Sequence, residues 1–176
     1  MANPQVILIG GRSGVGKSSA AFALHDLLSD HDVQHAVIEG DNLDLAHPAP
    51  WKHRLAERNL ASMWANYRAL GYHRLIYTNT VSVLEAEALR DAVGGTAEVT
   101  CVLLRASDAS IAERLGGREQ GESLRRHLER SARMAGRLDR AAPDGVHRIE
   151  TDGLTPCALA EQILGLSEWM RGSQDD

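Results

Sequence analysis

The fold is decided by the stretch Gly11-Arg12-Ser13-Gly14-Val15-Gly16-Lys17-Ser18, which comes directly after an apolar run and opens an Ala/Leu-rich segment. Its glycines, lysine and serine match the pattern G-x-x-x-x-G-K-[ST] without deviation. In this pattern successive backbone N–H groups turn inward around phosphate oxygens, and the following helix N-terminus adds partial positive charge. The stretch, extended to Ser19, therefore predicts a site for the phosphates of a nucleotide.

The lysine and the serine make this interpretation specific. Lys17 would neutralise the β- and γ-phosphates, and the Ser18 hydroxyl would be a ligand for Mg²⁺. Lys17 is one of only two lysines, the other being Lys52, in a chain that otherwise uses arginine. A glycine turn that merely joined strand to helix would need neither residue, so we expect a nucleoside triphosphate to bind here.

Apolar runs alternate with helical patterns along the rest of the chain. Strands are expected at 6–9, 36–39, 75–77, 99–104 and 146–151, with helices between them, including 51–70 and 108–115. Ser82 and Glu85 have the spacing of a capping box for a helix to about residue 93. Thr155-Pro156 predicts the start of a last helix that ends near Trp169. Continuous apolar strands alternating with helices predict a parallel sheet covered on both faces.

Length and composition limit the function classes. The 176 residues fit one domain, 1–176, and 43% hydrophobic with 24% charged residues excludes general disorder. A net charge of -5 gives no field that would attract nucleic acid or an anionic membrane. Cys101 and Cys157 form no disulfide framework, and the N-terminus lacks a basic region before its apolar run. We expect a cytoplasmic protein with no membrane or nucleic-acid partner.

The segment 116–142 is arginine-rich and shows no evident apolar stripe. Four arginines, 126, 130, 133 and 137, fall on one helical face, and the pairs Glu122 with Arg126 and Glu129 with Arg133 have i,i+4 spacing. This pattern favours a solvated, salt-bridged helix over an RNA-binding face. We also expect the segment to be the most mobile part of the free protein.

Three motifs together resemble the small P-loop kinases. They are the phosphate loop, Gly40-Asp41-Asn42 after the second expected strand, and Glu113-Arg114-Leu115-Gly116-Gly117-Arg118 after the fourth. The group includes adenylyl-sulfate kinase, gluconate kinase, shikimate kinase, chloramphenicol phosphotransferase and adenylate kinase. The resemblance implies a three-layer α/β P-loop NTPase fold, with a five-stranded parallel sheet of order 2-3-1-4-5 and a small helical lid at about 116–142.

The resemblance also implies roles for individual residues. Asp41 would orient the acceptor hydroxyl, take its proton late, or hold a water on Mg²⁺, although Gly-Asp-Asn is also an ordinary turn sequence. Arg118 would reach the transferring phosphate, and Arg114 would lie near the nucleotide base. Asp152 and Gly153, after the fifth expected strand, would lie against the adenine ring.

Two positions depart from the group's pattern. Asp44 stands where adenylyl-sulfate kinases carry an arginine, which makes an anionic nucleotide acceptor less favoured. The end of the third expected strand lacks the acidic residue that usually supports Mg²⁺, so Asn79, Thr80 or Asp41 through water would have to replace it. Arg54 and Arg58 are the candidate anion-binding residues of the acceptor region, whereas the helical spacing of Trp51, Trp64 and Tyr67 favours core positions.

The leading hypothesis is an ATP-dependent phosphotransferase that uses Mg²⁺ and acts on a hydroxyl of a small molecule, as a monomer or homodimer. One alternative is a nucleoside or nucleotide kinase, which would need an anion-binding acceptor pocket. Another is an ATP-binding switch without a phosphoryl acceptor, which the missing acidic residue favours.

Overall fold

Five parallel strands form one sheet in the order β2-β3-β1-β4-β5, as expected. The computed structural model describes residues 2–117 and 119–170. Within the sheet, Ile7 of the central strand lies beside Ile76 on one side and Thr100 on the other. The strands are β1 (Gln5–Gly10), β2 (Ala36–Glu39), β3 (Arg74–Thr78), β4 (Glu98–Arg105) and β5 (His147–Glu150).

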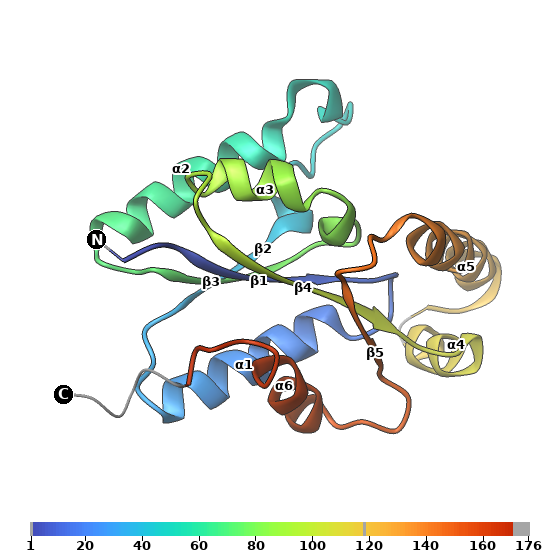
Figure 1. Ribbon diagram of the computed structural model, residues 1–176. Helices are drawn as coiled ribbons and strands as arrows, with labels where there is room; N and C mark the ends of the chain where they lie inside the picture. The colour runs from blue at the N-terminus through green and yellow to red at the C-terminus, as the bar shows by residue number, and fades with distance from the viewer. Residues whose placement is uncertain (1, 118, 171–176) are drawn as a thin grey trace.

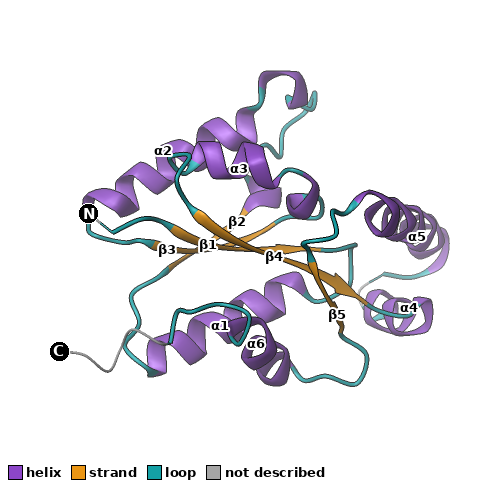
Figure 2. Ribbon diagram, viewed as in Figure 1, coloured by secondary structure: helices purple, strands orange, loops and turns teal. Residues whose placement is uncertain are grey.

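Helices cover both faces of this sheet and its carboxyl end. The α-helices are α1 (Lys17–Asp30), α2 (Leu55–Ala69), α3 (Ala86–Ala92), α4 (Asp108–Gly116), α5 (Gly121–Ala141) and α6 (Pro156–Leu164). Short 3₁₀ turns are η1 (Gly40–Asn42), η2 (Trp51–His53) and η3 (Ser82–Leu84). Figure 1 shows α1 and α6 on one face, α2 and α3 on the other, and α4 and α5 at the end where β1 and β4 finish. The same three layers stand out by colour in Figure 2.

The central strand supplies both halves of the core. Because successive side chains of a strand point to opposite faces, Ile7 and Ile9 pack with α1 and α6, while Val6 and Leu8 pack toward α2 and α3. All four are buried, which explains why β1 reads as a continuous apolar run. This packing fixes the loop that follows β1 at the carboxyl edge of the sheet.

One helix cap was predicted correctly and the other was not. The Thr155 hydroxyl accepts a hydrogen bond from Ala158 N at 3.2 Å, and Pro156 begins α6. The capping box at Ser82 and Glu85 is wrong. Ser82 is fully buried in η3, where its hydroxyl donates to Asn79 O at 3.1 Å, and α3 begins only at Ala86. Tertiary burial of Ser82 thus overrides the local capping pattern.

Two helices are shorter than their sequence patterns predicted. The pattern over 51–70 divides because Arg54 has a φ of 49°, which ends η2 and lets α2 begin at Leu55. The last helix ends at Leu164, before Gly165, rather than near Trp169. Trp169 is nevertheless only 2% exposed, because the chain after α6 folds back against the core.

The absence of an apolar stripe in 116–142 was predicted wrongly. Leu124 and Leu128 are half-buried against the main core, and Leu138 is buried farther along α5. Ser131 lies between them and is buried too. The sequence pattern hides this stripe because a serine occupies one of its positions. These buried residues dock α5 on the protein along its inner face.

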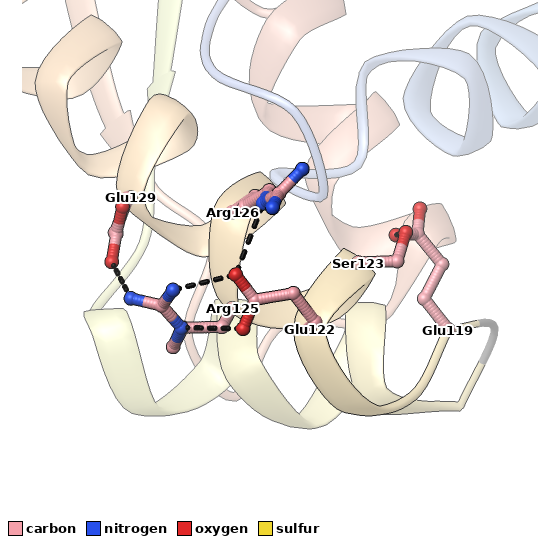
Figure 3. Close-up of polar contacts among 6 residues, drawn as sticks. All are labelled: Glu119, Glu122, Ser123, Arg125, Arg126 and Glu129. Carbon is pink, nitrogen blue, oxygen red and sulfur yellow. Dashed lines mark hydrogen bonds and ion pairs between the residues drawn. The ribbon is translucent and has the colours of Figure 1, made fainter.

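The outer face of α5 is salt-bridged, as expected, but one partner differs. Arg126 Nε donates to Glu122 at 3.0 Å, which confirms that pair. Arg125 donates both to Glu122, at 2.6 Å, and to Glu129, at 2.9 Å (Figure 3). Glu129 therefore pairs with Arg125 rather than with Arg133. Arg125 and Arg126 are thus held by carboxylates of the same helix.

Both cysteines, Cys101 and Cys157, are free thiols. In the part of the chain that the structure describes, no helix combines the length and apolar character required to cross a bilayer.

Candidate active site

The loop between β1 and α1 curves around a cavity of about 460 Å³. Gly11 has a φ of 144°, and a Cβ there would lie 2.8 Å from the carbonyl oxygen of Leu104, so only glycine fits. The cavity is lined by every loop residue from Ser13 to Ser19, including Gly14, Val15, Gly16, Lys17 and Ser18. The cavity thus lies at the N-terminus of α1, where the first backbone N–H groups have no partner within the helix, which is the arrangement that binds phosphate.

Lys17 reaches back over the loop that precedes it. Its Nζ donates to Gly11 O at 2.8 Å and to Arg12 O at 3.4 Å. Burial lowers the pKa of Lys17, and the negative charges of Asp41 and Glu39 oppose that shift. The folded protein thus keeps a poorly solvated ammonium group at the wall of the cavity, where a polyphosphate would stabilise its charge.

Asp41 enters the same cavity from the end of β2. It lies in η1, and its Oδ1 accepts a weak hydrogen bond from Thr80 N at 3.4 Å. Asn79 uses its Oδ1 for a turn, accepting from Val81 N at 2.9 Å. Of the proposed replacements for the missing acidic residue, Asp41 is therefore the carboxylate that shares the cavity with Ser18. One carboxylate and one hydroxyl, completed by phosphate oxygens and water, fit the ligand set of Mg²⁺.

Arg114 fastens the loop to the end of β5. Its guanidinium donates to Val15 O at 3.2 Å, to Thr151 Oγ1 at 3.1 Å and to Thr151 O at 3.3 Å. The Thr151 hydroxyl donates in turn to Val15 O at 3.3 Å. Arg114 lines the cavity, so it both positions the loop and brings positive charge to it.

The residues that complete the wall of the cavity differ from those expected. It is formed by Thr151, Leu154, Pro156 and Leu159, together with Leu115, and not by Asp152 and Gly153. Asp152 accepts instead from Ser107 N at 3.0 Å and faces a separate cavity of about 290 Å³ between β4, β5 and α5. Gly153 occupies the intervening turn with a φ of 74°. The Thr-Pro helix start was the signal available in the sequence, because it places Pro156 at the cavity.

The side chain of Arg12 points away from the phosphate cavity. It is 4% exposed, forms an ion pair with Asp108 at 2.6 Å, and donates to Ala106 O at 3.4 Å. It lines the 290 Å³ cavity instead. The side chain therefore fixes the loop against β4 and α4.

Helix α5 contacts the loop through residues that sequence reasoning missed. His127 Nε2 lies 2.8 Å from Ser13 Oγ, and its Nδ1 lies 2.8 Å from Glu119. Ser131 Oγ donates to Ser13 O at 3.0 Å. The hydrogen bond from His127 lowers the pKa of Glu119, with Ser123 adding to the effect. Arg118, the residue expected to reach the transferring phosphate, lies outside the described residues.

The region around the start of α2 is more open. Arg54 is exposed and donates to Glu57 at 3.0 Å, and Arg58 is exposed as well. Trp64 and Tyr67 pack in the core as predicted. Trp51 does not, because it lies in η2, outside α2, and is 75% exposed.

A family model described as an AAA domain matches residues 7–135. This match covers the loop, Asp41, Arg114 and most of α5. None of the curated proteins compared with the chain matches it.

Solved structures of small kinases share the fold. A gluconokinase from Sinorhizobium meliloti 1021 has 19% identity over 99% of this chain and 96% of its own, with a TM-score of 0.59. The Mycobacterium tuberculosis APS kinase, solved with AMPPNP and APS, has 16% identity over 94% and 98%, with a TM-score of 0.56. A shikimate kinase from Acinetobacter baumannii, solved with shikimate, has 20% identity over 94% and 93%, with a TM-score of 0.53.

The sequence motif, the order of the strands and the similar solved structures all indicate the same fold. The chain belongs to the AAA-domain family that the matching model describes, and its fold is that of the small P-loop kinases.

Proposed function

We propose that the protein is an ATP-dependent kinase that transfers the γ-phosphate to a hydroxyl group of a small molecule. The observation that carries the proposal is that Lys17, Ser18, Asp41 and Arg114 line one cavity at the carboxyl end of a parallel sheet. Open α/β sheets bind their ligands at this edge. In this proposal, the phosphate-binding residues and the Asp41 carboxylate border the same space, where the reacting atoms would meet.

Each residue has a distinct task in this proposal. The loop N–H groups and Lys17 hold the β- and γ-phosphates, while Arg114 keeps the loop in place against Thr151. Ser18 and Asp41 would hold Mg²⁺, which neutralises phosphate charge when bound. The acceptor oxygen forms a bond to the γ-phosphorus as the bond to the β,γ-bridging oxygen breaks, ADP leaves, and the hydroxyl proton passes to Asp41 and then to water.

The segment 116–142 would exclude water that competes as acceptor. His127 and Ser131 already attach α5 to Ser13 of the loop. Phosphates that bind in the loop would therefore act on α5 through these hydrogen bonds. We propose that nucleotide binding orders this segment further, and that Arg118 acts on the transferred phosphate.

A screen for acceptor-stimulated ADP release tests the proposed function. Hydroxyl compounds of different charge classes are added to the protein with ATP and Mg²⁺, and ADP is measured by a coupled assay. We expect at least one class to raise the rate above the hydrolysis background, and Lys17→Ala to abolish that increase. Nucleotide binding with no stimulation by any class would contradict kinase activity.

A switch that binds ATP without an acceptor is the second candidate. It is favoured by Asn79, which lies near the usual position of the acidic residue that supports Mg²⁺. The Oδ1 of Asn79 instead accepts a hydrogen bond from Val81 N within a turn. A switch would change partner binding with nucleotide and show no acceptor-stimulated turnover. A nucleotide kinase is less favoured, because Arg54, one of its two candidate anion-binding residues, is already paired with Glu57.

A further inference from the structure

A chain of three polar side chains joins the segment before α5 to the phosphate cavity. Ser13 lines the cavity, and its Oγ lies 2.8 Å from Nε2 of His127. Nδ1 of His127 lies 2.8 Å from Oε1 of Glu119, which comes just before α5. The side chain of His127 is 22% exposed and that of Glu119 is 33% exposed, so both are partly shielded from solvent. The chain thus connects a carboxylate to a hydroxyl at the phosphate site.

The carboxylate decides which imidazole nitrogen carries the hydrogen. The hydrogen bonds from His127 and Ser123 lower the pKa of Glu119, so at neutral pH its carboxylate is ionised and can only accept hydrogen bonds. The Ser123 hydroxyl donates to Glu119 Oε2 at 3.0 Å, which holds the carboxylate in place; Figure 3 shows both side chains. Nδ1 of His127 must therefore donate to Glu119, and in the neutral imidazole Nε2 is the acceptor.

With a neutral imidazole, the Ser13 hydroxyl has to donate to His127. A hydroxyl has one hydrogen to give, so Ser13 then offers only the lone pairs of its oxygen to the cavity. Phosphate oxygens are acceptors as well. This arrangement would therefore place two acceptors against each other where a phosphate binds beside Ser13.

A proton on Nε2 of His127 removes this conflict. The imidazolium donates from both nitrogens, Nδ1 to Glu119 and Nε2 to Ser13, and the carboxylate balances its charge. The hydroxyl hydrogen of Ser13 is then free to turn toward a phosphate oxygen. The proton comes from solvent and the Ser13 hydrogen stays on its own oxygen, so the change needs no other reactant.

The charged groups around His127 allow this change. Among the described residues, Glu119 is the carboxylate that pairs with the imidazole, and Arg130, farther along α5, acts on that carboxylate. The cations of the loop and of α4 are turned to other partners: Arg12 to Asp108, Lys17 to Gly11 O, and Arg114 to Val15 O and Thr151. Phosphate in the cavity would add its negative charge to that of Glu119 and favour the imidazolium further.

We infer that His127 is a positioning residue that takes up a proton when nucleotide binds, so that Ser13 can donate its hydroxyl hydrogen to a phosphate oxygen. The inference rests on the nucleotide site of the proposed function and adds a proton to nucleotide binding. His127 acts through Ser13 and needs no contact with the nucleotide. By linkage, the affinity for nucleotide should rise as pH falls through the range in which histidine gains its proton.

Calorimetry of AMPPNP binding with Mg²⁺, in buffers of different ionisation enthalpy, counts the protons taken up. At pH 7, we expect the wild type to take up at least about 0.3 proton per nucleotide more than His127→Gln, whose neutral amide gains none. The nucleotide's own ionisation contributes equally to both proteins, so the difference reports the histidine. His31→Gln, at an exposed position at the end of α1, is the matched control and should behave like the wild type.

A double substitution tests whether His127 acts through Ser13. At pH 7, Ser13→Ala and His127→Gln should each weaken AMPPNP affinity about five- to tenfold, and the double variant should be no weaker than the weaker single variant. Losses that multiply in the double variant would show that the two residues act independently, and would overturn the inference.

The ¹⁵N spectrum of the wild-type imidazoles keeps the test independent of how any variant folds. AMPPNP should move Nε2 of His127 from the signal of a bare nitrogen to that of a protonated one. An imidazole that stays neutral in the complex would overturn the inference, as would equal proton uptake by the wild type and His127→Gln.

These outcomes are distinct from those of the proposed function. A failed proton relay leaves the nucleotide site and kinase activity standing, because acceptor-stimulated ADP release is measured separately. No binding of AMPPNP to the wild type would contradict the nucleotide site itself, and the inference would fall with it.

Discussion

The nucleotide side and the acceptor side of the proposed active site are built differently. On the nucleotide side, polar groups are bound to one another: Arg114 joins Val15 and Thr151, and His127 and Ser131 hold Ser13. On the acceptor side, the Tyr77 hydroxyl has no partner within the described part of the chain, and Arg54 and Arg58 are exposed. The first side is organised before any ligand arrives, whereas the second leaves the Tyr77 hydroxyl without an internal hydrogen bond. Substitutions should therefore affect the two sides in different ways.

The largest effect is expected for Lys17→Ala. Loss of the ammonium group should lower turnover by roughly 10²- to 10³-fold, because phosphate charge loses its main neutralising group. The melting temperature of the free protein should barely change, since burial already disfavours the charged lysine and lowers its pKa. Steady-state kinetics and thermal melts measure both, with Lys52→Ala, on an exposed turn, as the matched control. Turnover near the wild-type rate would contradict the assignment of the loop.

Asp41→Asn tests the residue that both sides share. We expect kcat to fall by about 10²-fold, because the carboxylate acts on the acceptor proton in the transition state. The KM for ATP should change less, since the loop and Lys17 bind the phosphates. Asp44→Asn is the neighbouring control and should retain most of its kcat. An Asp41 variant that loses thermal stability but keeps its rate would show that Asp41 only forms a turn.

A pair of hydroxyl deletions compares the two sides directly. Thr151→Val removes a hydroxyl, on a residue 2% exposed, that bonds Arg114 and Val15, so it should lower the free energy of unfolding by about 1–2 kcal/mol. Tyr77→Phe removes a hydroxyl with no partner in the described chain, so its effect should stay below about 0.5 kcal/mol. Urea denaturation measures both. Equal losses would mean that the acceptor side is as internally bonded as the nucleotide side.

A local effect is expected for the attachment of α5. His127→Ala should lower the free energy of opening of α5 by about 1 kcal/mol, measured by hydrogen exchange, because the link from Glu119 to Ser13 is lost. AMPPNP should increase protection of 119–141 in the wild type. Equal protection with and without AMPPNP would contradict a closing lid.

The pH dependence of α5 protection tests the same contact between Glu119 and His127. The pKa of Glu119 is lowered in the folded state, so its contribution is present above its ordinary value of 4.5 and is lost as pH falls below that value. Protection of α5 should therefore decrease at acid pH in the wild type. Glu119→Gln should remove this pH dependence.

Much of the fold could be predicted from the sequence because its signals are local. The glycines and lysine of the loop, and the buried run of β1, have few other structural solutions. Ser82 and α5 were predicted wrongly for two different physical reasons. Tertiary burial decided the hydrogen bond of Ser82, and a serine, Ser131, interrupted the apolar stripe of α5.

The site was predictable where the backbone forms it and less so where side chains from distant elements meet. Lys17, Ser18, Asp41 and Arg114 followed from motifs and line the cavity. Thr151 and His127 could not be predicted from the sequence, because the role of a single threonine or histidine depends on contacts of about 3 Å that exist only in the folded chain.

Calorimetric titration of AMPPNP with Mg²⁺ tests the central claim most directly. We predict one binding site per chain in the wild type and in Lys52→Ala, and affinity weakened at least about tenfold in Lys17→Ala. No binding to the wild type, or the same affinity in Lys17→Ala as in Lys52→Ala, would contradict a nucleotide site built on this loop.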